Sequence, residues 1–454
     1  MKSNWAKDAV FYHIYPLGLC GAPLSNDFNT EPVNRLEKLY EWIDHISEMG
    51  ANAVYLGPVF ESLSHGYDTA DYFKVDRRLG TNETLKKLIA ALHSKNIRVI
   101  LDGVFNHVGR DFWAFKDVRN NLSGSAYCDW FQGLAFNGTS PFNDPFVYQG
   151  WNGYYNLVKL NLLNENVVRH LFDAVKMWID EFEIDGLRLD AADCLDKSFI
   201  KRLVKYCKEQ KNDFWLMGEV IHGDYREWAG NDMLDSVTDY ECYKGLYSSH
   251  VDKNYFEIAY SFNRLFGNEG IYKDLFLYNF ADNHDVNRVA SCLTSELHLY
   301  TLYFLLFTMP GIPSIYYGSE FGIKGKKEGN SDLPLRPALE LKDLINNAPL
   351  PDLFNLIIKL AVVRKNLPAL RNGNYRQLYL QHQQFAFLRE TDKEAVIVAV
   401  NSSNVPVDIE FTVPGKASLK FVDQISGEEL QASVGKIKMR LWPNWGRILT
   451  DKKS

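Results

Sequence analysis

Short apolar segments alternate with longer amphipathic segments over most of the chain. Runs dominated by apolar residues predict strands, and residues repeating at helical spacing predict helices between them. Such strands are predicted at 10–16, 52–59, 97–105, 186–192, 214–220, 275–285 and 311–320, and 235–240 is the best remaining strand candidate between 221 and 275. The clearest helical segments are 34–50, 83–96, 164–182, 197–210 and 297–309. Eight strand–helix units predict an α/β fold of the (β/α)8 barrel type. A doubly wound open sheet is disfavoured, because no G-x-G-x-x-G follows the first strand.

Two stretches depart from this alternation. The segment between the third strand and the helix at 164–182 is long and rich in Gly, Asn and aromatic residues, which favours an inserted subdomain over a structureless loop. After about residue 370, short strands alternate with Gly, Asn, Asp and Pro, which predicts an all-β sandwich. We therefore expect a barrel from 1–106 and 161–365, an inserted subdomain from 107–160, and a C-terminal β-sandwich domain from 366–454.

Composition narrows the class of protein. The chain has 454 residues, 46% hydrophobic and 24% charged, as expected for a globular protein of two or three domains. A net charge of −7 argues against a nucleic-acid partner. No apolar run is long enough to span a membrane, and the N-terminus lacks the apolar core of a signal peptide. The six cysteines are scattered, which favours reduced thiols and a cytoplasmic location.

The segment "GLRLDAAD" (186–193) places two charges on a predicted strand. Arg188 and Asp190 are two positions apart, so they project to the same side. One interpretation is a buried structural ion pair, which stabilises a fold only weakly. The other is a reactive carboxylate that a neighbouring guanidinium keeps ionised.

Polar residues at the ends of other strands favour the second interpretation. Asp102 ends the third strand and is followed by Asn106-His107, Glu219 ends the fifth, and Asn283-His284-Asp285 follows the seventh. The carboxyl ends of barrel strands meet at one face, so these groups are expected to converge. Singly, each has a structural explanation, such as a helix cap or a hydrogen-bonded histidine. A metallohydrolase is disfavoured, because no H-x-H follows the first strand and no lysine ends the fourth.

Four segments in order resemble the signatures of the α-amylase superfamily of retaining α-glycoside hydrolases. They are "DGVFNH" (102–107), "GLRLDAAD" (186–193), "GEV" (218–220) and "FADNHD" (280–285). "VKLN" (158–161) resembles the "PKLN" signature of the neopullulanase, cyclomaltodextrinase and maltogenic-amylase branch, although that branch usually has an N-terminal β-domain before its barrel. The resemblance covers nearly the whole chain and implies cleavage of glycosidic bonds with retention of configuration.

The resemblance also implies residue roles. Asp190 corresponds to the nucleophile that forms a glycosyl ester, and Arg188 orients it and keeps it ionised. Glu219 corresponds to the acid/base, and Asp285 to the third carboxylate, which binds sugar hydroxyls.

Five further residues are implied to bind substrate. His107 and His284 correspond to residues that hydrogen-bond the same sugar, and Tyr67 to one that stacks beneath it. Asp332 and Arg336, in "DLPLRP", resemble the pair that binds the next sugar on the non-reducing side, although the usual second arginine is missing.

Departures from the family pattern bear on substrate and metal. Asp193-Cys194 stands where the family often has Lys-His, and that lysine usually serves a leaving-group subsite. Asn106 matches a family ligand of a structural calcium, so calcium stays open, while the chemistry itself needs no cofactor.

These observations support an enzyme that cleaves α-1,4-glucosidic bonds in maltooligosaccharides, cyclodextrins or related short or cyclic α-glucans. The alternatives within the class are an α-glucan transglycosylase and an α-1,6-acting oligosaccharide hydrolase. A catalytically inactive amylase-like subunit and a lectin-like glucan-binding protein are the alternatives outside it; the three acids argue against the former. The expected partner is an oligosaccharide, and the sequence leaves the oligomeric state open.

Overall fold

Eight parallel strands form the central sheet of the computed structural model, which describes residues 5–414, 420–433 and 435–451. The strands neighbour one another in chain order, and a parallel bridge between Thr238 and Tyr278 joins the sixth strand to the seventh. The sheet therefore closes, which confirms the predicted (β/α)8 barrel. Its strands are β1 Phe11–Ile14, β2 Ala53–Leu56, β5 Arg98–Gly103, β9 Gly186–Leu189, β10 Trp215–Gly218, β11 Ser236–Val237, β12 Tyr278–Phe280 and β13 Ile312–Tyr316.

Helices surround the barrel, and several begin at side chains that cap them. Thr81 and Thr84 form a reciprocal capping box, and Asn164, Asp196 and Asp239 accept hydrogen bonds from the first turns of their helices. The main helices are α2 Tyr40–Glu48, α3 Asn82–Ser94, α5 Glu165–Phe182, α6 Lys197–Gln210, α7 Tyr240–Val251, α8 Phe256–Phe266, α10 His298–Thr308 and α12 Pro351–Asn366. Between 221 and 275 the sequence predicts only a strand. Helix α7 gives no periodic signal there, because its apolar and polar residues do not separate into two faces.

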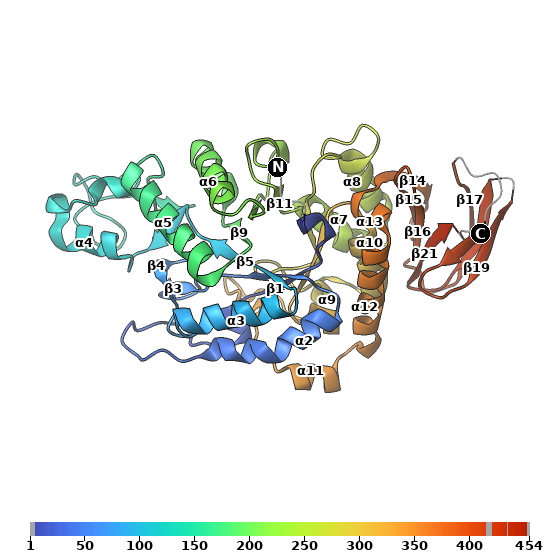
Figure 1. Cartoon of the computed structure of the whole chain (residues 1–454), viewed down its shortest axis with the longest axis horizontal. Helices are drawn as coiled ribbons and strands as arrows, with labels where there is room; N and C mark the ends of the chain where they lie inside the picture. The colour runs from blue at the N-terminus through green and yellow to red at the C-terminus, as the bar shows by residue number, and fades with distance from the viewer. Residues whose placement is uncertain (1–4, 415–419, 434, 452–454) are drawn as a thin grey trace.

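The segment between β5 and α5 forms a small unit of its own at one end of the molecule, around α4 in Figure 1. It contains a three-stranded antiparallel sheet and the helix α4 Trp113–Asn121. Phe115 packs edge-on against Phe131, Phe146 and Tyr148, so much of its aromatic content is local core. The strands are β6 His107–Gly109, β7 Gly150–Trp151 and β8 Tyr154–Lys159.

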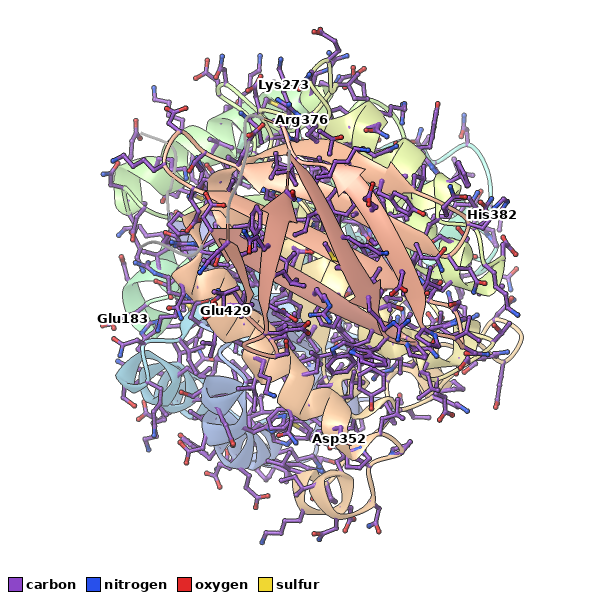
Figure 2. The ribbon with its side chains drawn as sticks, turned by 90° about the vertical axis from the view of Figure 1, so that its right-hand side faces the viewer. Glu183, Lys273, Asp352, Arg376, His382 and Glu429 are labelled. Carbon is purple, nitrogen blue, oxygen red and sulfur yellow. The ribbon has the colours of Figure 1, made fainter. Side chains whose placement is uncertain are left out.

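The C-terminal strands form an antiparallel sheet of eight strands at the other end of the molecule (Figure 1). The sheet folds over its own apolar core, and in Figure 2 its strands lie in front of the barrel helices. One of the short strands that the pattern after residue 370 predicts, at 417–423, begins outside the described residues, and the pattern predicted no strand at the position of β19. The strands are β14 Asn374–Leu380, β15 Gln384–Glu390, β16 Ala395–Asn401, β17 Val407–Thr412, β18 Lys420–Asp423, β19 Glu429–Ser433, β20 Lys436–Leu441 and β21 Trp445–Asp451.

Helix α10 lies between the barrel and the C-terminal domain, and for that reason it is apolar all round. Trp445 of β21 packs edge-on against Phe304 of this helix. Within the described ranges, no helix has the combination of length and apolarity that crossing a bilayer requires.

Candidate active site

The carboxyl ends of neighbouring barrel strands place two carboxylates side by side. Asp190 directly follows β9, and Glu219 directly follows β10. Each residue is only 8% exposed. The connection is made by Ala191, whose backbone has a left-handed conformation (φ 44°) that is uncommon outside glycine. Its N–H donates to Glu219 Oε2 at 3.1 Å, so the strained turn after Asp190 holds Glu219 in place.

A single guanidinium lies among three carboxylates at this end of the barrel. Arg188 Nη1 is 2.8 Å from Asp190 Oδ1 and 2.9 Å from Asp102 Oδ1, while Nη2 is 2.8 Å from Glu219 Oε2. Arg188 is 3% exposed, so these contacts are screened little by water. The sequence allowed two interpretations of Arg188, as one member of a structural ion pair or as the partner of one reactive acid. The structure differs from both, because one guanidinium contacts three carboxylates.

Burial and the sharing of one guanidinium change the pKa values of these acids. Burial raises the pKa of Asp190 well above its ordinary value, and Glu219 and Asp102 add to the rise, while Arg188 opposes it. Burial likewise raises the pKa of Glu219, again against Arg188. The sequence predicts that Arg188 keeps Asp190 ionised. That prediction considered Asp190 as the single carboxylate beside this guanidinium, whereas the structure places three carboxylates there.

The third acid has different surroundings. Asp285 follows β12, and its side chain is 35% exposed. Burial opposes its ionisation, but the charges and hydrogen bonds of His284 and Arg336 outweigh burial and lower the pKa of Asp285. His284 Nε2 is 2.9 Å from Asp285 Oδ2, and Arg336 Nη2 is 2.9 Å from Oδ1. Asp285 is thus held as a carboxylate while Glu219 favours the acid form.

Arg336 also links this acid to the other predicted pair. Its Nη2 lies 3.1 Å from Asp332 Oδ2, and its Nε donates to the carbonyl of His284. Lys327 holds the other carboxylate oxygen of Asp332 at 2.8 Å. Asp332 and Arg336 therefore lie beside Asp285, where the sequence places a neighbouring sugar-binding pair.

The aromatic and imidazole groups complete the same face. The Tyr67 hydroxyl contacts Asp102 and His284, and its ring stacks on the His284 ring with centroids 5.4 Å apart. His107 Nε2 is buried 3.9 Å from Asp190 Oδ2 and has no hydrogen-bond partner in the described chain. Burial lowers the pKa of His107 to about 3, so the ring is neutral near pH 7 and has a nitrogen available to a ligand.

Two residues of this site were missed by sequence reasoning. Tyr240 donates to Glu219 Oε1 at 3.3 Å and accepts from Asn283 Nδ2 at 3.2 Å. Tyr55 donates to Asp102 Oδ2 at 2.6 Å, which holds the partner of Arg188. A tyrosine in a strand or at a helix start gives no local signal of this kind, because it equally suits a packed core.

Asn106 does not by itself make a calcium site. Its Oδ1 is buried without a hydrogen-bond partner, which suits a cation ligand. Calcium takes about six to eight oxygens. Over the described ranges, no group of three or more His, Cys, Asp or Glu side chains is arranged to hold a metal. Calcium also takes Asn and backbone carbonyl oxygens, so a site at Asn106 stays a prediction, and none of the proposed chemistry uses calcium.

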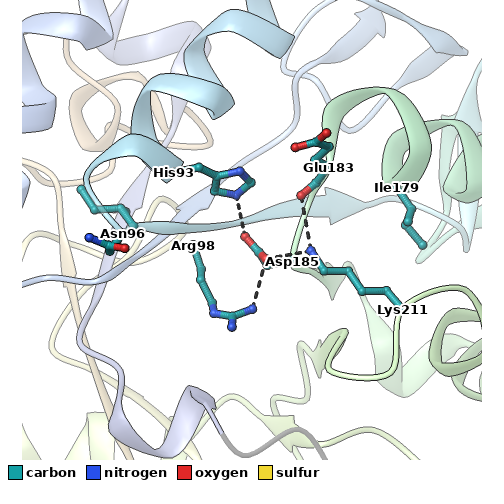
Figure 3. Close-up of a pocket in the computed structure, with 8 residues that line it drawn as sticks. His93, Asn96, Arg98, Ile179, Glu183, Asp185 and Lys211 are labelled. Atoms are coloured by element: carbon teal, nitrogen blue, oxygen red, sulfur yellow. Dashed lines mark hydrogen bonds and ion pairs between the residues drawn. The ribbon is translucent and has the colours of Figure 1, made fainter.

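A cavity of about 660 Å³ lies at the amino ends of the strands, away from this site. Figure 3 shows His93, Arg98 and Lys211 pointing toward Asp185, which lies between them. Asp185 also accepts the N–H of Val99, so both of its oxygens are satisfied by protein groups. The cluster ties β5, β9 and α3 together, and we assign it a structural role.

Known proteins are similar to this chain over nearly all of its length. Residues 26–352 match the family described as alpha amylase, catalytic domain. A cyclomaltodextrinase from Geobacillus thermopakistaniensis is 30% identical over 98% of this chain and 77% of its own, and neopullulanase 2 from Thermoactinomyces vulgaris is 30% identical over 98% and 78%. A solved structure of a cyclic alpha-maltosyl-(1→6)-maltose hydrolase from Arthrobacter globiformis superposes with a TM-score of 0.79 at 27% identity, covering 97% of this chain and 99% of that one.

Proposed function

Because the chain belongs to the α-amylase family of glycoside hydrolases, we propose that it hydrolyses α-1,4-glucosidic bonds in short or cyclic α-glucans with retention of configuration. The observation that carries this proposal is the bridge by Arg188 between two buried carboxylates of unlike role, Asp190 and Glu219, with the ionised Asp285 beside them. A retaining mechanism needs one carboxylate as nucleophile and one carboxylic acid as proton donor.

Asp190 is the proposed nucleophile. Its Oδ1 is bound to Arg188, which leaves Oδ2, on the His107 side, to attack the anomeric carbon. Three carboxylates share one guanidinium, so the set holds a proton more readily than isolated acids would. When Glu219 carries that proton, Asp190 stays ionised against Arg188, and the pair is ready to react.

Glu219 is the proposed acid/base. In the first step its proton passes to the glycosidic oxygen while the anomeric carbon–oxygen bond breaks and the bond to Asp190 forms. The leaving sugar departs with that proton. In the second step the Glu219 carboxylate takes a proton from water, whose oxygen displaces Asp190 from the anomeric carbon. Asp285 accepts hydrogen bonds from sugar hydroxyls throughout, since it is held as an anion.

The substrate class is supported by the names of relatives that act on cyclic or maltose-containing glucans. A transglycosylase is the alternative, because water and a sugar hydroxyl compete for one ester intermediate. An α-1,6 preference is the other alternative, and the solved relative is named for a substrate with a 1→6 bond. A cytoplasmic location is part of the proposal, because none of the six cysteines forms a disulfide.

The test is a product profile on maltotriose, α-, β- and γ-cyclodextrin, panose, pullulan and soluble starch. The proposal expects ring opening of cyclodextrins and shortening of maltotriose, with the α-anomer formed first. Cleavage confined to the 1→6 bond of panose would favour the α-1,6 alternative. Products longer than the substrate, dominating at low substrate concentration, would favour the transglycosylase.

A further inference from the structure

The segment 333–337, which carries Arg336, has little regular structure of its own. It contains only one short 3-10 turn, Leu333–Leu335. Arg336 Nη2 contacts both Asp285 and Asp332. The place of this segment on the barrel therefore decides where three charged groups of the site lie.

Two side chains of the barrel donate to the carbonyl of Leu335, the residue before Arg336. Arg288 Nε lies 3.1 Å from this oxygen, and the Tyr316 hydroxyl also lies 3.1 Å from it. Both donors are buried. Since both lone pairs of the oxygen are used, the peptide that leads into Arg336 has little freedom to move.

Arg288 connects this peptide to the carboxyl end of β13. Its Nη1 donates to the carbonyl of Tyr317 at 2.6 Å, and its guanidinium carbon lies 3.9 Å from the centroid of the Tyr316 ring. The Tyr317 hydroxyl in turn donates to the carbonyl of Pro337 at 2.9 Å. The peptides on both sides of Arg336 are therefore bonded to the same strand end.

The backbone of the segment also packs closely against two glycines. A side chain at Gly18 would collide with the carbonyl oxygen of Arg336, and one at Gly325 would collide with the carbonyl oxygen of Pro334. The N–H of Arg288 donates to the carbonyl of Gly325 at 3.0 Å. Arg288 therefore contacts the segment directly through its side chain and indirectly through its backbone.

An ion pair does not account for Arg288. Among the described residues, its guanidinium forms no ion pair with a carboxylate. Asp282 is near enough to respond to the charge, but its oxygens accept from the Ser319 hydroxyl and from the N–H of Val289. A buried cation without a close counter-charge is costly, so the bonds that it makes to backbone carbonyls call for a role.

We propose that Arg288 is a positioning residue, which fixes the peptide before Arg336 so that the Arg336 guanidinium binds Asp285 and Asp332 together. Arg288 does not touch the substrate and acts through Arg336. Its consequence is that Arg288 sets the preference for substrates with a second sugar on the non-reducing side of the reacting one. The proposal rests on the proposed function and on the expected binding of that sugar by Asp332 and Arg336.

The experiment compares two substrates that have the same leaving group. α-Glucosyl fluoride carries the reacting sugar alone, whereas α-maltosyl fluoride adds one sugar on its non-reducing side. In Arg288→Lys the positive charge stays, but one ammonium cannot hold the carbonyls of Tyr317 and Leu335 as a planar guanidinium does. We expect the ratio of kcat/KM on α-maltosyl fluoride to kcat/KM on α-glucosyl fluoride to fall about tenfold, the cost of one charged hydrogen bond.

A second variant and a matched control remove one tyrosine hydroxyl each. Tyr316→Phe keeps the ring beside Arg288 and removes the other donor to Leu335, so the same ratio should fall about threefold. Tyr278→Phe removes a buried hydroxyl that lies 2.6 Å from the Ser314 hydroxyl in the same barrel. This control should leave the ratio at its wild-type value.

A double-mutant cycle separates positioning from a general effect on the fold. If Arg288 acts through Arg336, adding Arg288→Lys to Arg336→Met should change the substrate ratio by less than about twofold. Two changes that act independently would multiply their effects on the ratio. Thermal melting of each variant shows whether it is folded at the assay temperature.

Several outcomes would overturn the proposal. They are an unchanged ratio in Arg288→Lys, equal losses on both fluorides, and independent effects in the double mutant. If Arg288→Lys melts below the assay temperature, Tyr316→Phe is judged by the same criteria, alone and combined with Arg336→Met. A wild-type chain that turns over both fluorides without preferring α-maltosyl fluoride would also overturn it. Failure of the wild type to turn over either fluoride would instead overturn the proposed function.

Discussion

Replacing Asp190 with Asn removes the proposed nucleophile while changing little else. The amide oxygen can still accept from Arg188 Nη1, which lies 2.8 Å from Asp190 Oδ1, and Arg188 keeps the Asp102 carboxylate as an ionic partner and its contact with Glu219. The guanidinium is thus not left buried without a counter-charge, which is the costly outcome of breaking such a pair. We expect the variant to fold.

Activity should respond very differently from stability. An amide cannot form the ester, so covalent catalysis is lost together with the negative charge beside the anomeric carbon. We expect kcat/KM on maltotriose to fall at least ~10³-fold, equivalent to about 4 kcal/mol of transition-state stabilisation. The assay is initial rates by reducing-sugar release, with thermal melting on the same samples.

A matched control is Asp102→Asn. Asp102 also contacts Arg188 but is held by Tyr55 and Tyr67 at the base of the site. We expect it to lose less activity than Asp190→Asn, because it positions Arg188 without meeting the sugar. Near-wild-type turnover in Asp190→Asn would refute the assignment of the nucleophile.

Three other predictions concern Trp151 in the wall of the cleft, the proposed acid Glu219, and Asp185 at the amino ends of the barrel strands. For the wild type we expect kcat/KM on maltooligosaccharides or cyclodextrins to be at least ~10-fold higher than on soluble starch, and Trp151→Ala should reduce this ratio. Equal kcat/KM on starch in the wild type would show that the cleft is open. Since burial raises the pKa of Glu219, activity on maltotriose should fall as pH rises through that pKa. The kcat/KM of Glu219→Gln on α-maltosyl fluoride should show no such fall at high pH. A fall that persists in this variant would point to another titrating group. Burial opposes ionisation of Asp185, but hydrogen bonds from His93 and Lys211 lower its pKa to about 2. The lowered pKa contributes about 2 kcal/mol to the free energy of unfolding above pH 4, and this contribution is lost as pH falls toward 2. Urea unfolding should therefore show that Asp185→Asn loses more stability at pH 7 than at pH 3, and equal losses would contradict the ionic role.

Hydrophobic periodicity was enough to predict the barrel. Seven of its strands are short, buried and marked by apolar runs, whereas the two-residue β11 was predicted within 235–240 only as the remaining candidate between 221 and 275. The helices α7 and α8 were missed. The boundaries of the hairpin β3 Phe60–Ser62 and β4 Thr69–Val75, which carries Tyr67 in its loop, were missed as well. The apolar residues of α8 do lie on one face, so its periodicity was overlooked, whereas those of α7 are not separated in this way.

The site shows the same division. The spacing of Arg188 and Asp190 placed them on one side of a strand, and the structure shows that contact at 2.8 Å. The sharing of Arg188 with Glu219 depends on the pairing of β9 with β10, which no local pattern encodes. Protonation depends on that sharing and on burial, so the raised pKa of Asp190 could not be read from the sequence.

The most direct test of the retaining mechanism is to trap the covalent intermediate. Glu219→Gln should react with α-maltosyl fluoride, because fluoride leaves without an acid, and the ester should then accumulate because its hydrolysis lacks a base. Peptide mass spectrometry of the quenched protein should find a maltosyl group on the peptide that contains Asp190, and on no other. A maltosyl group on Asp285 would reverse the assigned roles, and turnover of the fluoride with inversion and no adduct would contradict the retaining mechanism itself.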